Sequence, residues 1–192
     1  MLADIVSRVK PGDVVFLPSL RMPRYVDQWA KMQQGSVDAA IFGKDSASTL
    51  EGAVRAATPV LQQLNAKGAR VIVSAPNLLL KLPLYRCADA YDAMNPICSD
   101  GADVNRADFE RLRASMLGAV TALTQSVPDA SVWDPFPVLC PPGPVCHAYM
   151  DGRPLFFDGD HLSGFANRLL LPSFEEAVGT EYGTRGVAAV GD

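Results

Sequence analysis

The sequence predicts an α/β fold that is built on a parallel sheet. Residues 13–19 and 70–76 are two continuous apolar runs bounded by turn residues, which is typical of strands covered on both faces. Between them, apolar residues recur at helical spacing over residues 48–64. A strand, a helix and a second strand in this order form a βαβ unit, in which the strands are parallel and the crossover is right-handed.

The other elements are predicted from the same kinds of signal. Residues 1–9 are predicted to be the end of a helix, which a Lys-Pro-Gly sequence stops. Residues 105–126 carry the clearest helical period, with Asn105 as the N-cap. The remaining predictions are a short helix that packs through Tyr25, Trp29 and Met32, an irregular segment over residues 77–102, a third strand over 131–134, a hairpin over 147–157 that turns at Asp151-Gly152, and a final helix over 162–174 that Pro172 limits.

The whole chain has the size and composition of one globular domain. Its 192 residues are enough for a sizeable core, and we expect the domain to span residues 1–178, followed by a flexible tail over 179–192 with little to bury. The net charge of −4, without a cluster of Lys and Arg, argues against a nucleic-acid partner. No apolar run is long enough to span a bilayer, and the N-terminus lacks the pattern of a signal peptide.

Polar residues follow the first predicted strand at its carboxyl end. Ligands bind at this end of the strands in open α/β sheets, so Ser19 and Arg21 are candidate substrate-binding residues. We interpret Arg24 as a surface residue solvated by water.

Four cysteines fall into two local pairs, each in a loop-like neighbourhood. Four cysteines allow three pairings, and the sequence alone does not choose among them. Pairing of neighbours, Cys87 with Cys98 and Cys140 with Cys146, would close two short loops, and disulfides favour an oxidising compartment. The alternative is a metal site that uses Cys140, Cys146 and His147. Zinc sites usually have tighter Cys-x-x-Cys spacings, so we predict disulfides and no metal.

The strongest candidate for chemistry is the pair Asp158 and His161, which lies just ahead of the final predicted helix. A carboxylate fixes the tautomer of a histidine, and the histidine takes and returns a proton near neutral pH, as activation of a serine nucleophile requires. Ser163 is placed to cap the helix that follows. The alternative is that Asp158 and His161 only cap or solvate the start of this helix.

Several blocks together resemble a known family. The blocks are Lys10-Pro-Gly-Asp-Val-Val-Phe-Leu-Pro-Ser-Leu-Arg21, Ala75-Pro76 with its cysteine loop, Trp133-Asp134-Pro135 with the loop from Cys140 to Cys146, and Phe157-Asp158-x-x-His161-Leu-Ser163. They resemble the SGNH or GDSL-like hydrolases, and most closely the extracytoplasmic SGNH domains fused behind integral-membrane acyltransferases that O-acylate surface polysaccharides.

The resemblance implies a three-layer α/β/α, flavodoxin-like fold and a Ser-His-Asp triad in which His161 is the base and Asp158 the acid, with no cofactor. It implies an O-acetyltransferase or acetyl esterase that acts on cell-surface carbohydrate, with an acyl donor or acylated carbohydrate as substrate. It also implies a membrane acyltransferase domain N-terminal in the full-length parent and a location on the periplasmic face of the inner membrane.

The chain departs from this family at the nucleophile. Members carry a Gly-Asp-Ser block after their first strand, but here Gly12-Asp13 precedes Val14 and Gly159-Asp160 precedes His161. We therefore expect a sheet truncated at its N-terminal strands, and a serine supplied by the parent chain or by a neighbouring polypeptide. The alternative is a noncatalytic carbohydrate-binding or structural module, or an inactive fragment.

Overall fold

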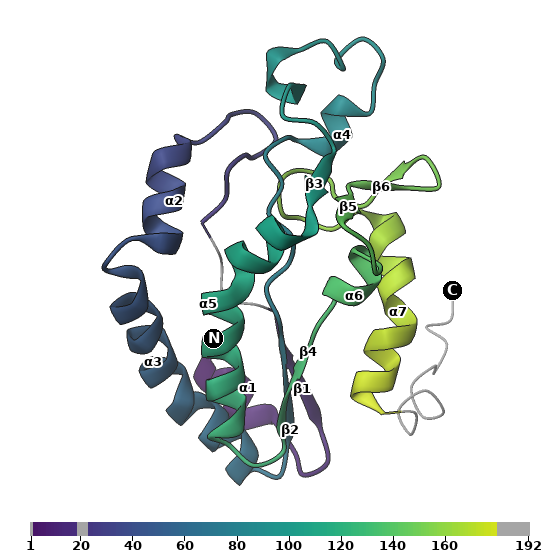
Figure 1. The fold of residues 1–192 in the computed structure, drawn as a ribbon. Helices are drawn as coiled ribbons and strands as arrows, with labels where there is room; N and C mark the ends of the chain where they lie inside the picture. Colours follow the sequence, from purple (N-terminus) through teal and green to yellow (C-terminus); the bar gives the residue numbers. More distant parts are fainter. Residues whose placement is uncertain (1, 19–22, 180–192) are drawn as a thin grey trace.

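A three-stranded parallel sheet forms the centre of the structure, a computed structural model that describes residues 2–18 and 23–179 (Figure 1). Its strands are β1 (Val14–Leu17), β2 (Arg70–Ser74) and β4 (Ala130–Trp133), in the order β1-β2-β4. The register pairs Val15 with Val71, and Val71 with Ala130. The central strand β2 is buried on both faces, as its uninterrupted apolar run predicts.

Helices cover both faces of this sheet. On one face lie α3 (Ser46–Ala66) and α5 (Arg106–Gln125) (Figure 1). Their apolar side chains pack against those of alternate strand residues. On the other face, α7 (Gly164–Val178) places the ring of Phe174 4.9 Å from that of Phe16 and 5.1 Å from that of Trp133. The predicted α/β fold with a parallel sheet between helices is confirmed.

Apart from α1 (Leu2–Arg8), which precedes β1 and lies toward the amino ends of the strands, most of the smaller elements lie toward the carboxyl ends (Figure 1). An antiparallel ribbon and a short hairpin there connect the sheet to α7. The other smaller helices are α2 (Gln34–Phe42), α4 (Leu84–Cys87), the 3-10 helix η1 (Pro96–Cys98) and α6 (Phe136–Leu139). The ribbon pairs β3 (Asp103–Asn105) with β5 (Val145–His147), and the hairpin pairs β6 (Tyr149–Met150) with β7 (Arg153–Pro154).

Two of the local predictions are wrong. Residues 25–32 form a turn instead of a helix, because the Asp27 carboxylate accepts hydrogen bonds from the N–H groups of Trp29 and Ala30, both at 2.7 Å. Pro172 lies inside α7, which continues to Val178 because its apolar side packs on the sheet on both sides of the proline. The cap at Asn105 is confirmed, since its side chain accepts from the N–H of Ala107 at 2.9 Å.

Disulfides join Cys87 to Cys98 and Cys140 to Cys146, the pairing of neighbours. The first closes the irregular segment after α4, and the second closes the loop between α6 and β5. A cysteine in a disulfide is not available as a metal ligand, so the alternative site with His147 is not formed. None of the helices in the described ranges has the length and hydropathy that a membrane span requires. Apart from Gly179, the predicted tail over residues 179–192 lies outside the described residues.

Removal of the Cys87–Cys98 disulfide should destabilise the protein by about 3 kcal/mol, because an open loop gives the unfolded chain more conformational freedom. The measurement is urea unfolding of the variant with both Cys87→Ser and Cys98→Ser. The matched control replaces Cys140 and Cys146 by Ser, and its shorter loop should cost about 2 kcal/mol. Four free thiols in the native protein without reductant would contradict the pairing.

Candidate functional site

A short loop between β7 and α7 holds the candidate site, and its own backbone fixes both of its ends. Phe156 pairs with Leu162 in an isolated bridge, and the N–H of Phe157 donates to the carbonyl of His161 at 2.7 Å. Ser163 closes the loop, since its Oγ accepts from the N–H of Ala166 at 3.1 Å and donates to the carbonyl of Pro154 at 2.7 Å. Ser163 is therefore the cap of α7, as the sequence predicts.

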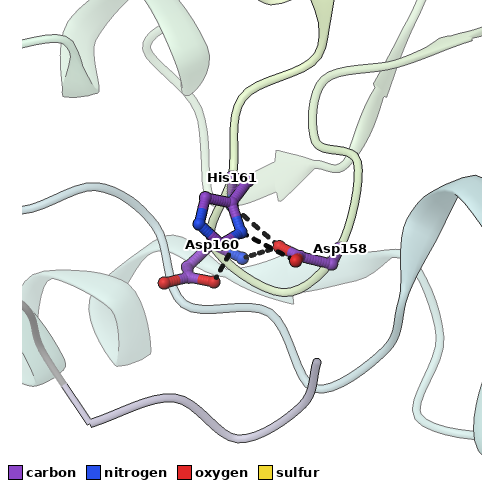
Figure 2. Close-up of side chains that lie close together, drawn as sticks. All are labelled: Asp158, Asp160 and His161. Atoms are coloured by element: carbon purple, nitrogen blue, oxygen red, sulfur yellow. Dashed lines mark hydrogen bonds and ion pairs between the residues drawn. The ribbon is translucent and has the colours of Figure 1, made fainter. Parts of the chain in front are cut away.

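Asp158 and His161 are in direct contact in this loop (Figure 2). Asp158 Oδ2 lies 2.7 Å from His161 Nδ1, while its other oxygen, Oδ1, accepts from the N–H groups of Asp160 and His161 at 3.0 and 2.9 Å. The Asp158 side chain is 2% exposed and the His161 side chain is 53% exposed. With Nδ1 donating to the carboxylate, Nε2 carries the lone pair of the ring and is the atom that can accept a proton.

Gly159 allows this loop to pack closely against two neighbouring segments. A Cβ at this position would lie 2.6 Å from Val26 Cγ1 and 2.8 Å from the Val26 carbonyl oxygen. The carbonyl of Gly159 also accepts from the N–H of Leu80 at 2.8 Å. Any larger residue would push the loop, and His161 with it, away from the body of the domain.

The surroundings shift the pKa values of the two carboxyl groups of the loop, Asp158 and Asp160, in opposite directions. Burial alone would raise the pKa of Asp158, but the hydrogen bonds from two backbone N–H groups and the contact with His161 lower it below its ordinary value. Burial raises the pKa of Asp160, assisted by the negative charge of Asp158 and opposed by Arg24 and His161. Asp158 is therefore held as the ionised partner of the imidazole.

Arg24 belongs to this site, so its interpretation as a solvated surface residue is wrong. Its Nη2 lies 3.1 Å from Asp160 Oδ2, and Asp160 Oδ1 lies 3.5 Å from His161 Nδ1. Neither contact has a sequence signal, because Arg24 is remote from the loop in sequence and Asp160 is one of many aspartates. The other candidates after the first strand, Ser19 and Arg21, lie outside the described residues.

Asp158, Asp160 and His161 offer oxygen and nitrogen atoms within 4.8 Å of one another, a spacing that a cation could bridge. In the structure, however, His161 Nδ1 is engaged with Asp158, and Asp160 is engaged with Arg24. A cation would compete with the contact between His161 Nδ1 and Asp158, whereas Asp160 Oδ1 has no hydrogen-bond partner among the described residues. The arrangement fits a carboxylate that orients an imidazole for proton transfer better than it fits a metal site.

Comparison with known proteins identifies the family. A family model described as SGNH domain (fused to AT3 domains) matches residues 1–176. The chain belongs to this SGNH family. No curated protein and no solved structure matches the chain. The family resemblance seen in the sequence blocks is therefore confirmed, and the SGNH domain is of the kind fused to AT3 acyltransferase domains.

Replacement of Asp158 by Asn should lower the free energy of unfolding by about 2 kcal/mol at neutral pH, because hydrogen bonds to a buried carboxylate are lost. Since the pKa of Asp158 is lowered by folding, its contribution is full above the ordinary aspartate pKa of about 4 and is lost as the pH falls through the folded pKa. Urea unfolding at neutral pH and at about pH 3 measures this change.

The matched control is Asp103→Asn, which removes the exposed partner of the other histidine, His147. Exposed ion pairs contribute little, so this variant should lose less than about 1 kcal/mol at either pH. A loss in Asp158→Asn that is the same at both pH values would contradict the assignment of Asp158 as an ionised, buried partner.

Proposed function

We propose that this SGNH domain catalyses acyl transfer through a serine nucleophile, as an O-acetyltransferase or acetyl esterase acting on cell-surface carbohydrate. The observation that carries the proposal is the 2.7 Å contact between a buried Asp158 and a half-exposed His161. This is the pairing that a serine needs for activation. Family membership supports the same chemistry, because these domains are fused to AT3 acyltransferase domains.

In the first step, His161 Nε2 takes the proton of the serine hydroxyl while the serine Oγ attacks the acyl carbonyl of the donor. His161 then gives this proton to the departing alcohol, and an acyl-serine ester remains. In the second step, His161 takes a proton from a sugar hydroxyl or from water, whose oxygen attacks the ester, and His161 returns this proton to the serine Oγ as the serine leaves. Asp158 is a positioning residue that orients the ring and stabilises the imidazolium.

The serine is proposed to come from a segment outside residues 1–192, since the chain has no Gly-Asp-Ser block. Within the described residues, β1 pairs only with β2, so its other edge can accept a further strand. Two serines near the site are already engaged: Ser163 Oγ caps α7, and Ser74 Oγ donates to the carbonyl of Ala75 at 3.0 Å. Two disulfides support a location outside the cytoplasm. The fusion of this domain family to AT3 domains supports a neighbouring acyltransferase domain.

The experiment compares this chain with the full-length parent polypeptide, using hydrolysis of p-nitrophenyl acetate with and without an acceptor sugar. We expect turnover only from the polypeptide that carries the Gly-Asp-Ser segment. In that polypeptide, His161→Ala should lower kcat/KM by about 100-fold or more, because the general base is lost. His147→Ala is the matched control, since this ring also contacts a carboxylate, at 2.8 Å, but lies on β5. Equal losses from the two variants, or no loss from His161→Ala, would refute the proposal.

A noncatalytic carbohydrate-binding module is the second candidate, favoured by the missing Gly-Asp-Ser block. It would bind glycans without turnover in the full-length polypeptide, and His161→Ala would leave that binding unchanged.

A further inference from the structure

Three large aromatic side chains are exposed beside the candidate site. Trp29 is 76% exposed, Tyr85 62% and Phe157 38%. Aromatic side chains of this size are usually buried, and an exposed group of them marks a binding surface. We call Trp29, Tyr85 and Phe157 the aromatic platform.

The platform is rigid and is tied to His161. The rings of Tyr85 and Phe157 lie 5.0 Å apart at 32°, and the N–H of Tyr85 donates to the carbonyl of Phe157 at 3.0 Å. Phe157 directly precedes Asp158 and its N–H donates to the carbonyl of His161 at 2.7 Å. The backbone positions of Tyr85, Phe157 and His161 relative to one another are therefore fixed by these hydrogen bonds.

Arg86, the residue after Tyr85, links the segment of Trp29 to that of Tyr85. The Arg86 guanidinium lies 5.5 Å from the centre of the Trp29 ring, and its Nη1 donates to the carbonyl of Gln28 at 3.2 Å. The Cys87–Cys98 disulfide begins at the next residue and anchors this segment. These contacts anchor the segments that carry the platform, which lowers the entropic cost of ordering it on binding.

The chemistry of the platform fits a sugar ring. A pyranose presents a face of C–H groups that stacks on a flat aromatic ring and a border of hydroxyls that need hydrogen-bond partners. Charged partners lie beside the rings: Arg86 over Trp29, and the pair of Arg24 and Asp160 next to His161. Asp27, within electrostatic reach of Arg24 and Asp158, accepts from the N–H of Trp29 and keeps a lowered pKa. Acidic groups here and the net charge of −4 disfavour an anionic bilayer as the partner.

We propose that the aromatic platform binds an uncharged sugar ring of a glycan and holds one of its hydroxyls toward His161. This inference rests on the proposed function, because it assigns the acceptor side of that reaction to Trp29, Tyr85 and Phe157. It adds a stacking surface, built from two loops far apart in sequence, to the proton-transfer pair of the site.

The test measures binding to the chain without any turnover, so it is independent of the serine. The probes are chitotriose, cellotriose and mannotriose, and the readout is the fluorescence of the two tryptophans and its quenching by acrylamide. Trp29 is exposed, whereas Trp133 packs between Phe16 and Phe174. We expect at least one trisaccharide to protect the exposed tryptophan from quenching.

Tyr85→Ala should weaken this binding by about tenfold, while Tyr85→Phe, which keeps the ring, should retain it. Tyr91→Ala is the matched control, because Tyr91 is 94% exposed in the disulfide-closed segment that follows Tyr85 but forms none of the ring contacts of the platform. Far-UV circular dichroism checks that each variant is folded.

Failure of all three sugars to protect the tryptophan would overturn the proposal. So would equal effects of Tyr85→Ala and Tyr91→Ala, or binding to phosphatidylglycerol vesicles in place of the sugars. Sugar binding that depends on Tyr85, together with an inactive full-length polypeptide, would refute the proposed function. It would still support the binding of a sugar ring by the aromatic platform.

Discussion

The buried carboxylate of Asp158 is the constraint on which the site depends. An ionised carboxylate is stable away from water only when donors replace its lost hydration, and here the N–H groups of Asp160 and His161 and the His161 ring provide them. Gly159 lies between Asp158 and these donors in sequence, and its close packing against Val26 leaves no room for a Cβ. Burial of one side chain thus dictates the conformation of the whole loop and the direction of the imidazole.

The sheet supports this loop through the segments that leave its strands. The chain continues from β2 to Leu80, which donates to Gly159, and from β4 to Asp134, which accepts from the N–H of Phe136 and pairs with the buried Arg113 at 2.6 Å. A buried ion pair contributes little net stability but is costly to break, so it fixes where the chain turns after β4. The segments after β2 and β4 thus begin from strands that the sequence predicts as apolar runs.

Elements set by local patterns could be predicted from the sequence, whereas contacts between remote segments could not. The strands of the central sheet, α3 and α5 depend on local patterns and could be located by their period, and the Asp158–His161 pair could be located by its spacing together with the family resemblance. The turn around Trp29, the contact of Arg24 with Asp160 and the ribbon of β3 with β5 depend on partners remote in the chain. Propensity also favoured the wrong structure at the turn, because apolar residues there suggested a helix where the Asp27 carboxylate captures two N–H groups.

A comparison of the two histidine–carboxylate contacts shows why distance alone does not define a site. His147 lies 2.8 Å from Asp103 and His161 lies 2.7 Å from Asp158, yet the carboxylate is 68% exposed in the first pair and 2% exposed in the second. Water competes for the exposed carboxylate and leaves the His147 ring weakly oriented, whereas backbone donors hold Asp158 in a single geometry. Because that geometry is complete within four consecutive residues, it needs no contact from the nucleophile. The serine proposed to come from a separate segment would therefore meet an imidazole that is already oriented.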